Sequence, residues 1–442
     1  MNQLFILFFA LYPVMVITLL QKSGFSILRL GTIQFVSISL FFFGFLGTLP
    51  LYFGWDEYRV SLGVNDQYLV FKVMMFSGIT MLLFIVGAVS AKTVFYAPAT
   101  LNKFNRIHFN KKEIQISFLF FLFVLVVLAV YLSKIPDVAL FVAVTEGAQE
   151  AALARSRMGN EFPGKYHWYS LIMHDLANVI TFSFFSAFLI TKKKQYSIAF
   201  FLSFLVSSFT ALMATEKVPF VWLIIGLFLA YVATKRNGQY PLKQLITLFV
   251  LVLTAVALSY LYFTDTPNLL NAFSNVFSRA FGGSIQPAYH YLEFFPEHQD
   301  FLLGTSFPNP GGLLPFEPYR LTREVMNWVD PSGAKIGVVG SVGSMPTVLW
   351  GEAYANFGYL GITIIPFLIG FLVFTIDYFV SKIADTPLKI GLYVWLVLHY
   401  SNLANAGFSK FILDIYLFSI IAICLLIFSL SNNLKIKTKS SV

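Results

Sequence analysis

The chain has 442 residues, of which 57% are hydrophobic and only 12% are charged, and its mean hydropathy is +0.75. A soluble domain is about 45–50% apolar and about 25% charged, so this composition excludes a soluble protein. It indicates a polytopic helical membrane protein of the all-α class, with one integral membrane domain over residues 1–442. The net charge of +9 would suggest acidic partners in a soluble protein, but here it mostly reports orientation across the membrane.

Eleven apolar stretches are long enough to cross a bilayer, which takes about 20 residues at about 1.5 Å of rise each. The first stretch has no basic segment and no cleavage site, so we expect a retained helix and not a signal peptide. In chain order the stretches are 2–20, 31–53, 70–91, 114–133, 170–191, 196–214, 218–234, 244–263, 353–376, 390–409 and 411–430.

The loops between these stretches differ in charge from one side of the membrane to the other. More than half of the 30 Lys and Arg residues fall on one side, which includes the basic tail 431–442. Of the 21 acidic residues, only Glu113, Asp377 and Asp385 lie on that side. The positive-inside rule therefore places the C-terminus in the cytoplasm, and the odd number of spans places the N-terminus on the outer face.

Two large loops then lie on the outer side, at 134–169 and 264–352. The first contains an Ala-rich stretch at 139–159, which predicts a short helix at the membrane face. The second begins with an amphipathic pattern over 268–295, and we expect this helix to be broken at Gly282-Gly283.

The stretch 304–361 is polar and rich in Gly and Pro. Loops longer than about 12–15 residues are usually functional or disordered, and the aromatic residues and regular glycines here argue against disorder. Motifs of soluble enzymes are missing: there is no phosphate-cradling glycine loop, no zinc-ligand spacing and no GxSxG. With six His and one Cys, we expect no metal, no cofactor and no nucleic-acid partner.

Basic residues stand near the outer ends of several predicted helices. Arg is the usual residue for two-pronged recognition of phosphate. Lys217 follows Glu216 in a short turn, where it either marks the water boundary or faces an anion. For Arg155 and Arg157 the alternative to a ligand contact is a solvated or paired helix face, whereas Arg279 interrupts an apolar pattern, which favours a functional role. The full set is Arg155, Arg157, Lys217, Arg279, Arg320 and Arg323.

Few ionisable residues fall inside the predicted spans, and such residues usually mark pathways or sites. Asp175 and Asp414 lie near the outer surface, whereas His399 is expected near mid-span. The stripe of His399, Asn402 and Asn405 is either part of such a site or a set of interhelical hydrogen bonds.

Glu352 stands where the large loop re-enters the membrane. A carboxylate at this boundary is placed to act as a general base or to pair with an arginine. On a helix, Glu352 shares a face with Asn356, which follows at a spacing of four.

The residues GEAYANFGYLG at 351–361, preceded by Trp350, resemble a GEAYxNFGxxG stretch found in one branch of the Wzy family of O-antigen and oligosaccharide repeat-unit polymerases. In that branch the stretch opens the helix after the large periplasmic loop. The glycine-rich approach at 340–344 and the basic residues Arg155, Arg157 and Lys217 support the resemblance. One departure is that no Arg of the two main loops is followed by Gly eleven positions later, as in some members, so roles tied to that pattern are not carried over.

The resemblance implies a GT-C-like glycosyltransferase at the periplasmic face of the bacterial inner membrane, with a periplasmic N-terminus. The donor is a growing glycan on a polyprenyl diphosphate, and the acceptor is one lipid-linked repeat unit. The acceptor hydroxyl attacks the anomeric carbon, and polyprenyl diphosphate leaves. Further implied partners are the lipid bilayer, a chain-length regulator and the repeat-unit flippase.

This reaction needs cations on the leaving diphosphate and a base near the attacking hydroxyl. An O-antigen ligase is one alternative, although the chains related to it carry a His before the post-loop helix and 338–361 contains none. A flippase or transporter is the other, although its repeat symmetry and midplane binding residues are not evident. For the polymerase we expect diphosphate contacts from Arg155, Arg157, Lys217 and Arg279, substrate contacts from Arg320, Arg323 and Asn356, and a base among Glu352, His290 and Asp175.

Overall fold

The computed structural model describes residues 1–98, 101, 104, 107–159, 161–263, 268–309, 312–331, 343–412 and 414–431. Within these ranges the regular structure is helical, with an isolated β-bridge between Arg29 and Gln239 and no β-strand. The all-α prediction is confirmed for this part of the chain. The tail residues 432–442 and the glycine-rich residues 340–342 lie outside the described residues.

Nine helices within these ranges are long and apolar enough to cross a membrane, as expected for a polytopic helical membrane protein. Two more helices match the remaining predicted stretches, namely α13 (Leu242–Phe263) and α19 (Pro387–Ser401); the number of eleven spans stays a prediction. The nine are α1 (Asn2–Lys22), α2 with η1 and α3 (Thr32–Tyr52), α5 (Gln67–Val94), α6 (Lys111–Leu132), α9 with η2 and α10 (Tyr166–Thr191), α11 (Lys194–Leu212), α12 (Val218–Lys235), α18 (Leu349–Ser381), and α20 (Ser409–Ile412) with α21 (Ile415–Leu430).

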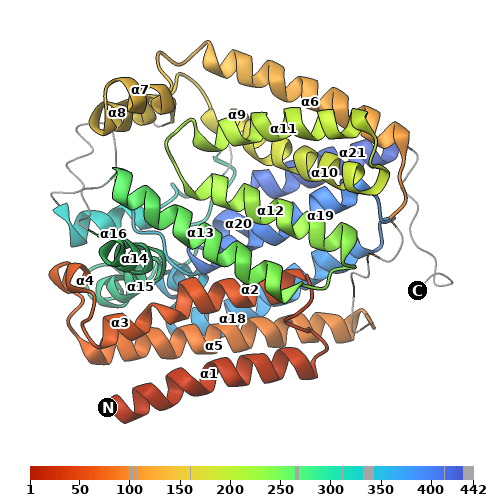
Figure 1. The fold of residues 1–442 in the computed structure, drawn as a ribbon. Helices are drawn as coiled ribbons and strands as arrows, with labels where there is room; N and C mark the ends of the chain where they lie inside the picture. The colour runs from red at the N-terminus through yellow and green to blue at the C-terminus, as the bar shows by residue number, and fades with distance from the viewer. Residues whose placement is uncertain are drawn as a thin grey trace.

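Most of the short helices gather at one end of the molecule, which we call the loop end, together with the N-terminus (Figure 1, left). At the opposite end, called the tail end, Asn110 Nδ2 donates to the carbonyl oxygen of Ser431 at 3.3 Å. The helices at the loop end are α4 (Glu57–Ser61), α7 (Ala139–Thr145), α8 (Ala148–Met158), α14 (Leu269–Phe277), η3 (Ser278–Gly282), α15 (Gly283–Phe294) and α16 (Leu321–Val329).

Two glycines allow α5 and α18 to pack with their backbones in contact. A Cβ added to Gly87 would stand 1.9 Å from the carbonyl oxygen of Phe367, and one added to Gly370 would stand 1.9 Å from that of Phe84. In a membrane the hydrophobic effect does not drive helices together, because lipid tails are as apolar as the side chains. Small residues at a helix contact let the backbones approach closely and gain van der Waals packing. This packing fixes α18, whose first turns carry Glu352.

α18 is kinked at Gly358, inside the stretch that resembles the polymerase family. Gly358 has φ 59° and ψ −142°, a conformation that is essentially accessible only to glycine. The ring of Phe301 packs at this point, since a Cβ on Gly358 would lie 3.0 Å from Phe301 Cζ. The kink separates the first turns of α18 from its long apolar part.

Two predictions about the loop helices are wrong in detail. The helix over 268–295 is not broken at Gly282-Gly283, because α14 continues through the π-helical turn η3 into α15. The single helix expected over 139–159 is instead two helices, α7 and α8, because Gly147 between them adopts φ +97°. Helix α16, within the second large loop, was not expected.

The predicted stretch 390–409 also differs from the structure. α19 ends at Ser401, and a short 3-10 turn, η6 (Asn402–Ala404), follows it. His399 therefore lies in the last turn of α19 and not near mid-span.

Candidate functional site

Three cationic side chains from separate segments come together at the loop end. Arg59 belongs to α4, Lys217 directly precedes α12, and Arg279 lies on η3. Burial lowers the pKa of both Arg59 and Lys217, and the positive charge of Arg279 acts on each in the same direction. Like charges this close favour the approach of an anion. We call Arg59, Lys217 and Arg279 the cationic group.

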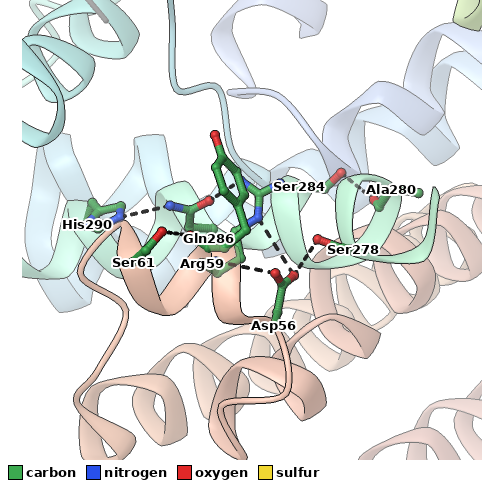
Figure 2. A network of polar contacts seen from close by, with 9 residues as sticks. Asp56, Arg59, Ser61, Ser278, Ala280, Ser284, Gln286 and His290 are labelled. Carbon is green, nitrogen blue, oxygen red and sulfur yellow. Dashed lines mark hydrogen bonds and ion pairs between the residues drawn. The ribbon is translucent and has the colours of Figure 1, made fainter. Parts of the chain in front are cut away.

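Asp56 holds Arg59 against η3 (Figure 2). Its Oδ1 accepts from the backbone N–H of Arg59 at 3.3 Å, which caps α4, and its Oδ2 lies 3.9 Å from Arg59 Nε. Oδ2 also accepts from Ser278 Oγ at 2.5 Å. Because the side chains of Asp56 and Arg59 are 7% and 13% exposed, water screens this pair poorly.

A line of hydrogen bonds continues from Arg59 into α15 (Figure 2). Arg59 Nη1 donates to Gln286 Oε1 at 2.5 Å, and Gln286 Nε2 lies 3.2 Å from His290 Nε2. On the far side of the imidazole, His290 Nδ1 lies 3.0 Å from Glu293 Oε2. A single amide thus connects His290, one of the predicted candidate bases, to the cationic group.

The local sequence explains why η3 and α15 approach Arg59 so closely. A Cβ added to Gly283 would stand 2.7 Å from Arg59 Nη2, and one added to Gly282 would stand 3.0 Å from Asp56 Oδ2. The glycine pair that was expected to break the helix instead makes room for the charged pair. Single π-helical turns of this kind are frequent at functional sites.

Arg155 and Arg157, both predicted to bind diphosphate, are paired with carboxylates. Arg155 Nη2 donates to Glu216 Oε1, and Arg157 Nη1 donates to Asp137 Oδ2 at 3.1 Å. The four side chains are between 41% and 51% exposed, and exposed pairs of this kind contribute about 0–1 kcal/mol. These contacts match the alternative of a paired helix face. The partner of Arg155, Glu216, directly precedes Lys217 in the chain.

Arg320 and Arg323 lie in the second large loop. Arg320 directly precedes α16 and Arg323 falls in its first turn, and both side chains are exposed. Their contact with substrate stays a prediction.

The carboxylate of Glu352 is buried and held from two sides. Oε1 accepts from Ser306 Oγ at 2.9 Å and from Ser409 Oγ, and Oε2 accepts from the backbone N–H of Ser409 at 2.9 Å. A Cβ added to Gly407 would stand 2.4 Å from Oε2, so only glycine at position 407 lets the backbone come this close to the carboxylate. Glu352 therefore fastens the long loop and the start of α20 to the first turn of α18.

Asn356 completes this arrangement, which we call the Glu352 clasp (Ser306, Glu352, Asn356 and Ser409). Asn356 Oδ1 accepts from the backbone N–H of Gly304 at 2.9 Å, while Nδ2 donates to Ser306 Oγ and to the carbonyl oxygen of Glu352, each at 2.8 Å. The shared face expected from the spacing of four is confirmed, and the chain's own loop occupies it.

Asp175 and His399 belong to a third group, where η2 meets α19. Asp175 Oδ1 accepts from Trp395 Nε1 at 2.9 Å, and the His399 ring stacks on Trp395 with centroids 4.7 Å apart. His399 Nε2 lies 3.1 Å from the carbonyl oxygen of Phe411, and Asn402 Nδ2 donates to the carbonyl oxygen of His399 at 3.2 Å. The contact from His399 to Phe411 matches the interhelical interpretation of the stripe, whereas Asn402 bonds within the end of its own helix.

The cationic group, the His290–Glu293 pair and the Glu352 clasp offer different chemistry. The cationic group can bind an anion, the His290–Glu293 pair can accept a proton, and the Glu352 clasp fixes the loops around them. Across the part of the chain that the structure describes, no three His, Cys, Asp or Glu side chains are grouped as a metal ion would require.

Sequence reasoning missed Asp56, Arg59 and Gln286. The stretch GWDEYRVSLGVND at 54–66 does carry a signal, namely opposite charges three residues apart in a short loop that is predicted to lie on the outer side. Such a pair is normally a solvated helix cap, so the pattern alone did not single it out. Gln286 carries no signal in the sequence.

The resemblance to the Wzy family rests on residues of the chain itself, chiefly 350–361. Comparison with protein-family models, with curated proteins and with solved structures found no match for this chain.

Proposed function

We propose that this protein polymerises polyprenyl-diphosphate-linked oligosaccharide repeat units at the outer face of a bacterial inner membrane. The observation that carries the proposal is the cationic group at the loop end, connected through Gln286 to the buried His290. A diphosphate leaving group gains negative charge as the glycosidic bond breaks, and fixed cations stabilise that charge. The positive-inside pattern and the resemblance of 350–361 support the same function.

In the proposed reaction the acceptor hydroxyl gives its proton to His290 Nε2 while its oxygen attacks the anomeric carbon of the donor. The bond between that carbon and the diphosphate oxygen breaks, and polyprenyl diphosphate leaves with the bonding electron pair. Arg59, Lys217 and Arg279 offset the charge of the leaving group. Glu293 stabilises the protonated imidazole through Nδ1.

His290 is favoured over the other two candidate bases because of their contacts. The oxygens of Glu352 already accept three hydrogen bonds from Ser306 and Ser409. The carboxylate of Asp175 accepts a hydrogen bond from Trp395, between η2 and α19. Glu352 and Asn356 therefore act in this proposal as positioning residues for the long loop.

Deletion of the gene is the simplest test of the proposed reaction. Without a polymerase, single repeat units are still ligated, so a gel of surface glycolipid should show core that bears one repeat unit and no longer chains. A plasmid copy should restore the ladder. Core without any repeat unit would point to a ligase or a flippase, and an unchanged ladder would contradict the proposed function altogether.

Replacement of Lys217 should change how polymerisation depends on pH. Burial and the Arg279 charge lower the pKa of Lys217, so its charge is lost at lower pH than for an exposed lysine. Polymerisation by the purified wild-type protein should therefore decline on the alkaline side. Lys217→Arg stays charged there and should move this decline to higher pH, whereas Lys217→Ala and Lys217→Glu should lose polymerisation.

The control is Lys194→Ala, an exposed lysine at the start of α11 on the tail end. It should leave both chain length and the pH dependence unchanged. Normal polymer from all three Lys217 variants would mean that Lys217 only marks the water boundary.

A further inference from the structure

The hydrogen bond between Arg59 and Gln286 fixes the position of a proton on His290. A guanidinium has only donors, so the amide group that faces Arg59 Nη1 must be the oxygen of Gln286. The amide nitrogen of Gln286 then faces His290 Nε2, and an amide nitrogen can only donate. His290 Nε2 is therefore an acceptor without a proton, and the ring proton sits on Nδ1, where it is donated to Glu293 Oε2.

In this arrangement Nε2 of His290 is occupied by the amide N–H₂ of Gln286. A proton on Nε2 would face the N–H₂ of Gln286, so that two donors would meet. Both side chains are only 2% exposed, which leaves little water to relieve such a contact. An unsatisfied buried donor is costly, so the amide in this orientation disfavours a proton on Nε2.

The other end of the amide is held by a side chain that is suited to bind an anion. Among the described residues, Arg59 Nε has no hydrogen-bond partner although it is buried. Arg279 is close enough to act electrostatically on Arg59, and the carboxylate that faces Arg59 is that of Asp56, 3.9 Å from Arg59 Nε. An anion received by Arg59 and Arg279 would compete directly with Gln286 Oε1 for the guanidinium.

We propose that binding of a diphosphate ester by Arg59 and Arg279 releases Gln286, whose amide turns over so that its oxygen faces His290 Nε2 and stabilises a proton there. Gln286 is then a positioning residue that links anion binding to proton uptake. The identity of the anion rests on the proposed function, whereas the link between anion and proton rests on the geometry of Arg59, Gln286 and His290 alone.

The charged and titratable groups around His290 are consistent with this link. Glu293, on the same helix, accepts from Nδ1 in both states and favours the protonated ring. Tyr289 packs edge-on against His290, and burial raises its pKa, so it stays a neutral phenol that accepts from the backbone N–H of Asp66. From α16 the uncharged ring of Trp328 approaches His290 edge-on. Arg59 acts through Gln286.

Linkage makes the effect reciprocal: if the anion favours the proton, the proton must favour the anion by the same factor. The probe is the symmetrical dimethyl ester of diphosphate, whose two negative charges do not change over the range in which histidine titrates. The purified full-length protein should bind this ester about tenfold more tightly at mildly acid than at mildly alkaline pH. At mildly acid pH, nitrogen NMR of histidine-labelled protein, with the signal assigned by His290→Asn, should show Nε2 unprotonated without the ester and protonated with it. At the higher pH of polymerisation the released Nε2 stays free to take the proton of the acceptor hydroxyl.

Two substitutions at Gln286 should act in opposite directions. Gln286→Glu presents a carboxylate oxygen to His290 at all times, so Nε2 should carry a proton even without the ester. Gln286→Met cannot accept from Nε2, so the ester should leave Nε2 unprotonated. In both variants the pH dependence of ester binding should shrink to less than about twofold, and thermal unfolding should show that each is folded.

Arg236→Gln, an exposed residue at the tail end, is the matched control and should behave as the wild type. A wild-type Nε2 that is protonated without the ester, an Nε2 that does not respond to it, or an ester that does not bind would each overturn the inference. Because neither measurement needs a glycan, the inference and the proposed function can fail separately. If the deletion strain makes a normal polymer ladder while the ester still changes the protonation of His290 Nε2, only the proposed function is contradicted.

Discussion

Arg59→Ala should reduce polymerisation by about 10²–10³-fold, because it removes a preorganised donor for the leaving diphosphate from a site that is poorly screened by water. Arg59 is 13% exposed and is fixed by Asp56 and Gln286, so its guanidinium does not have to be ordered when the donor binds. Chain length on a gel of surface glycolipid, and turnover of lipid-linked repeat units by purified protein, are the measurements.

Arg59→Lys should recover little of the loss, since a lysine cannot offer the diphosphate the two-pronged donor geometry of a planar guanidinium. Arg279→Ala serves as the companion variant because Arg279 is exposed, so its removal should impair turnover without disturbing the fold. Arg236→Gln again provides the control. Wild-type chain lengths in both Arg59→Ala and Arg279→Ala would remove the cationic group from the site.

Glu352→Ala should lower the free energy of unfolding by roughly 2–4 kcal/mol. In the wild type, donors of Ser306 and Ser409 share the Glu352 carboxylate, and the substitution leaves these buried donors without an acceptor. The long loop would lose its attachment to α18, and polymer should disappear together with stability. Thermal unfolding in detergent and the glycolipid gel measure the two effects. Glu317→Ala, an exposed carboxylate in the same loop, is the control and should change neither.

Glu352→Gln separates a positioning role from a catalytic one. Its amide oxygen can still accept from the backbone N–H of Ser409, and its nitrogen can donate to the hydroxyl oxygens of Ser306 and Ser409, which rotate to accept. We therefore expect a folded protein that retains polymerisation. If Glu352→Gln is as stable as the wild type but makes no polymer, Glu352 is the base and His290 is not.

The hydropathy of the chain determined most of the architecture. Stretches such as 2–20 and 70–91 became α1 (Asn2–Lys22) and α5 (Gln67–Val94) because a segment in lipid must satisfy every backbone group internally. Charges at helix ends were likewise readable, since ionisable groups are kept near water. The ends of helices were predicted less accurately where a glycine or a short helical turn intervenes, as at Gly147 and after Ser401.

The grouping of the charges was decided by the tertiary structure. Arg155 and Arg157 stand two residues apart, yet one pairs with Glu216 and the other with Asp137. The sequence showed Arg279 as an isolated charge, and nothing local indicated that Arg59 would reach Gln286, 227 positions later.

By itself, the sequence determined the class of protein, the positions of most helices and several candidate residues for binding phosphate or moving a proton, although not Arg59 or Gln286. Which side chains lie together was decided only when α4, η3 and α15 packed against one another, with Gly282 and Gly283 leaving room for Asp56 and Arg59. The physical reason is one of range. Hydropathy and helix propensity act over a few neighbouring residues, whereas hydrogen bonds and ion pairs between buried side chains depend on distances that only the packed chain sets.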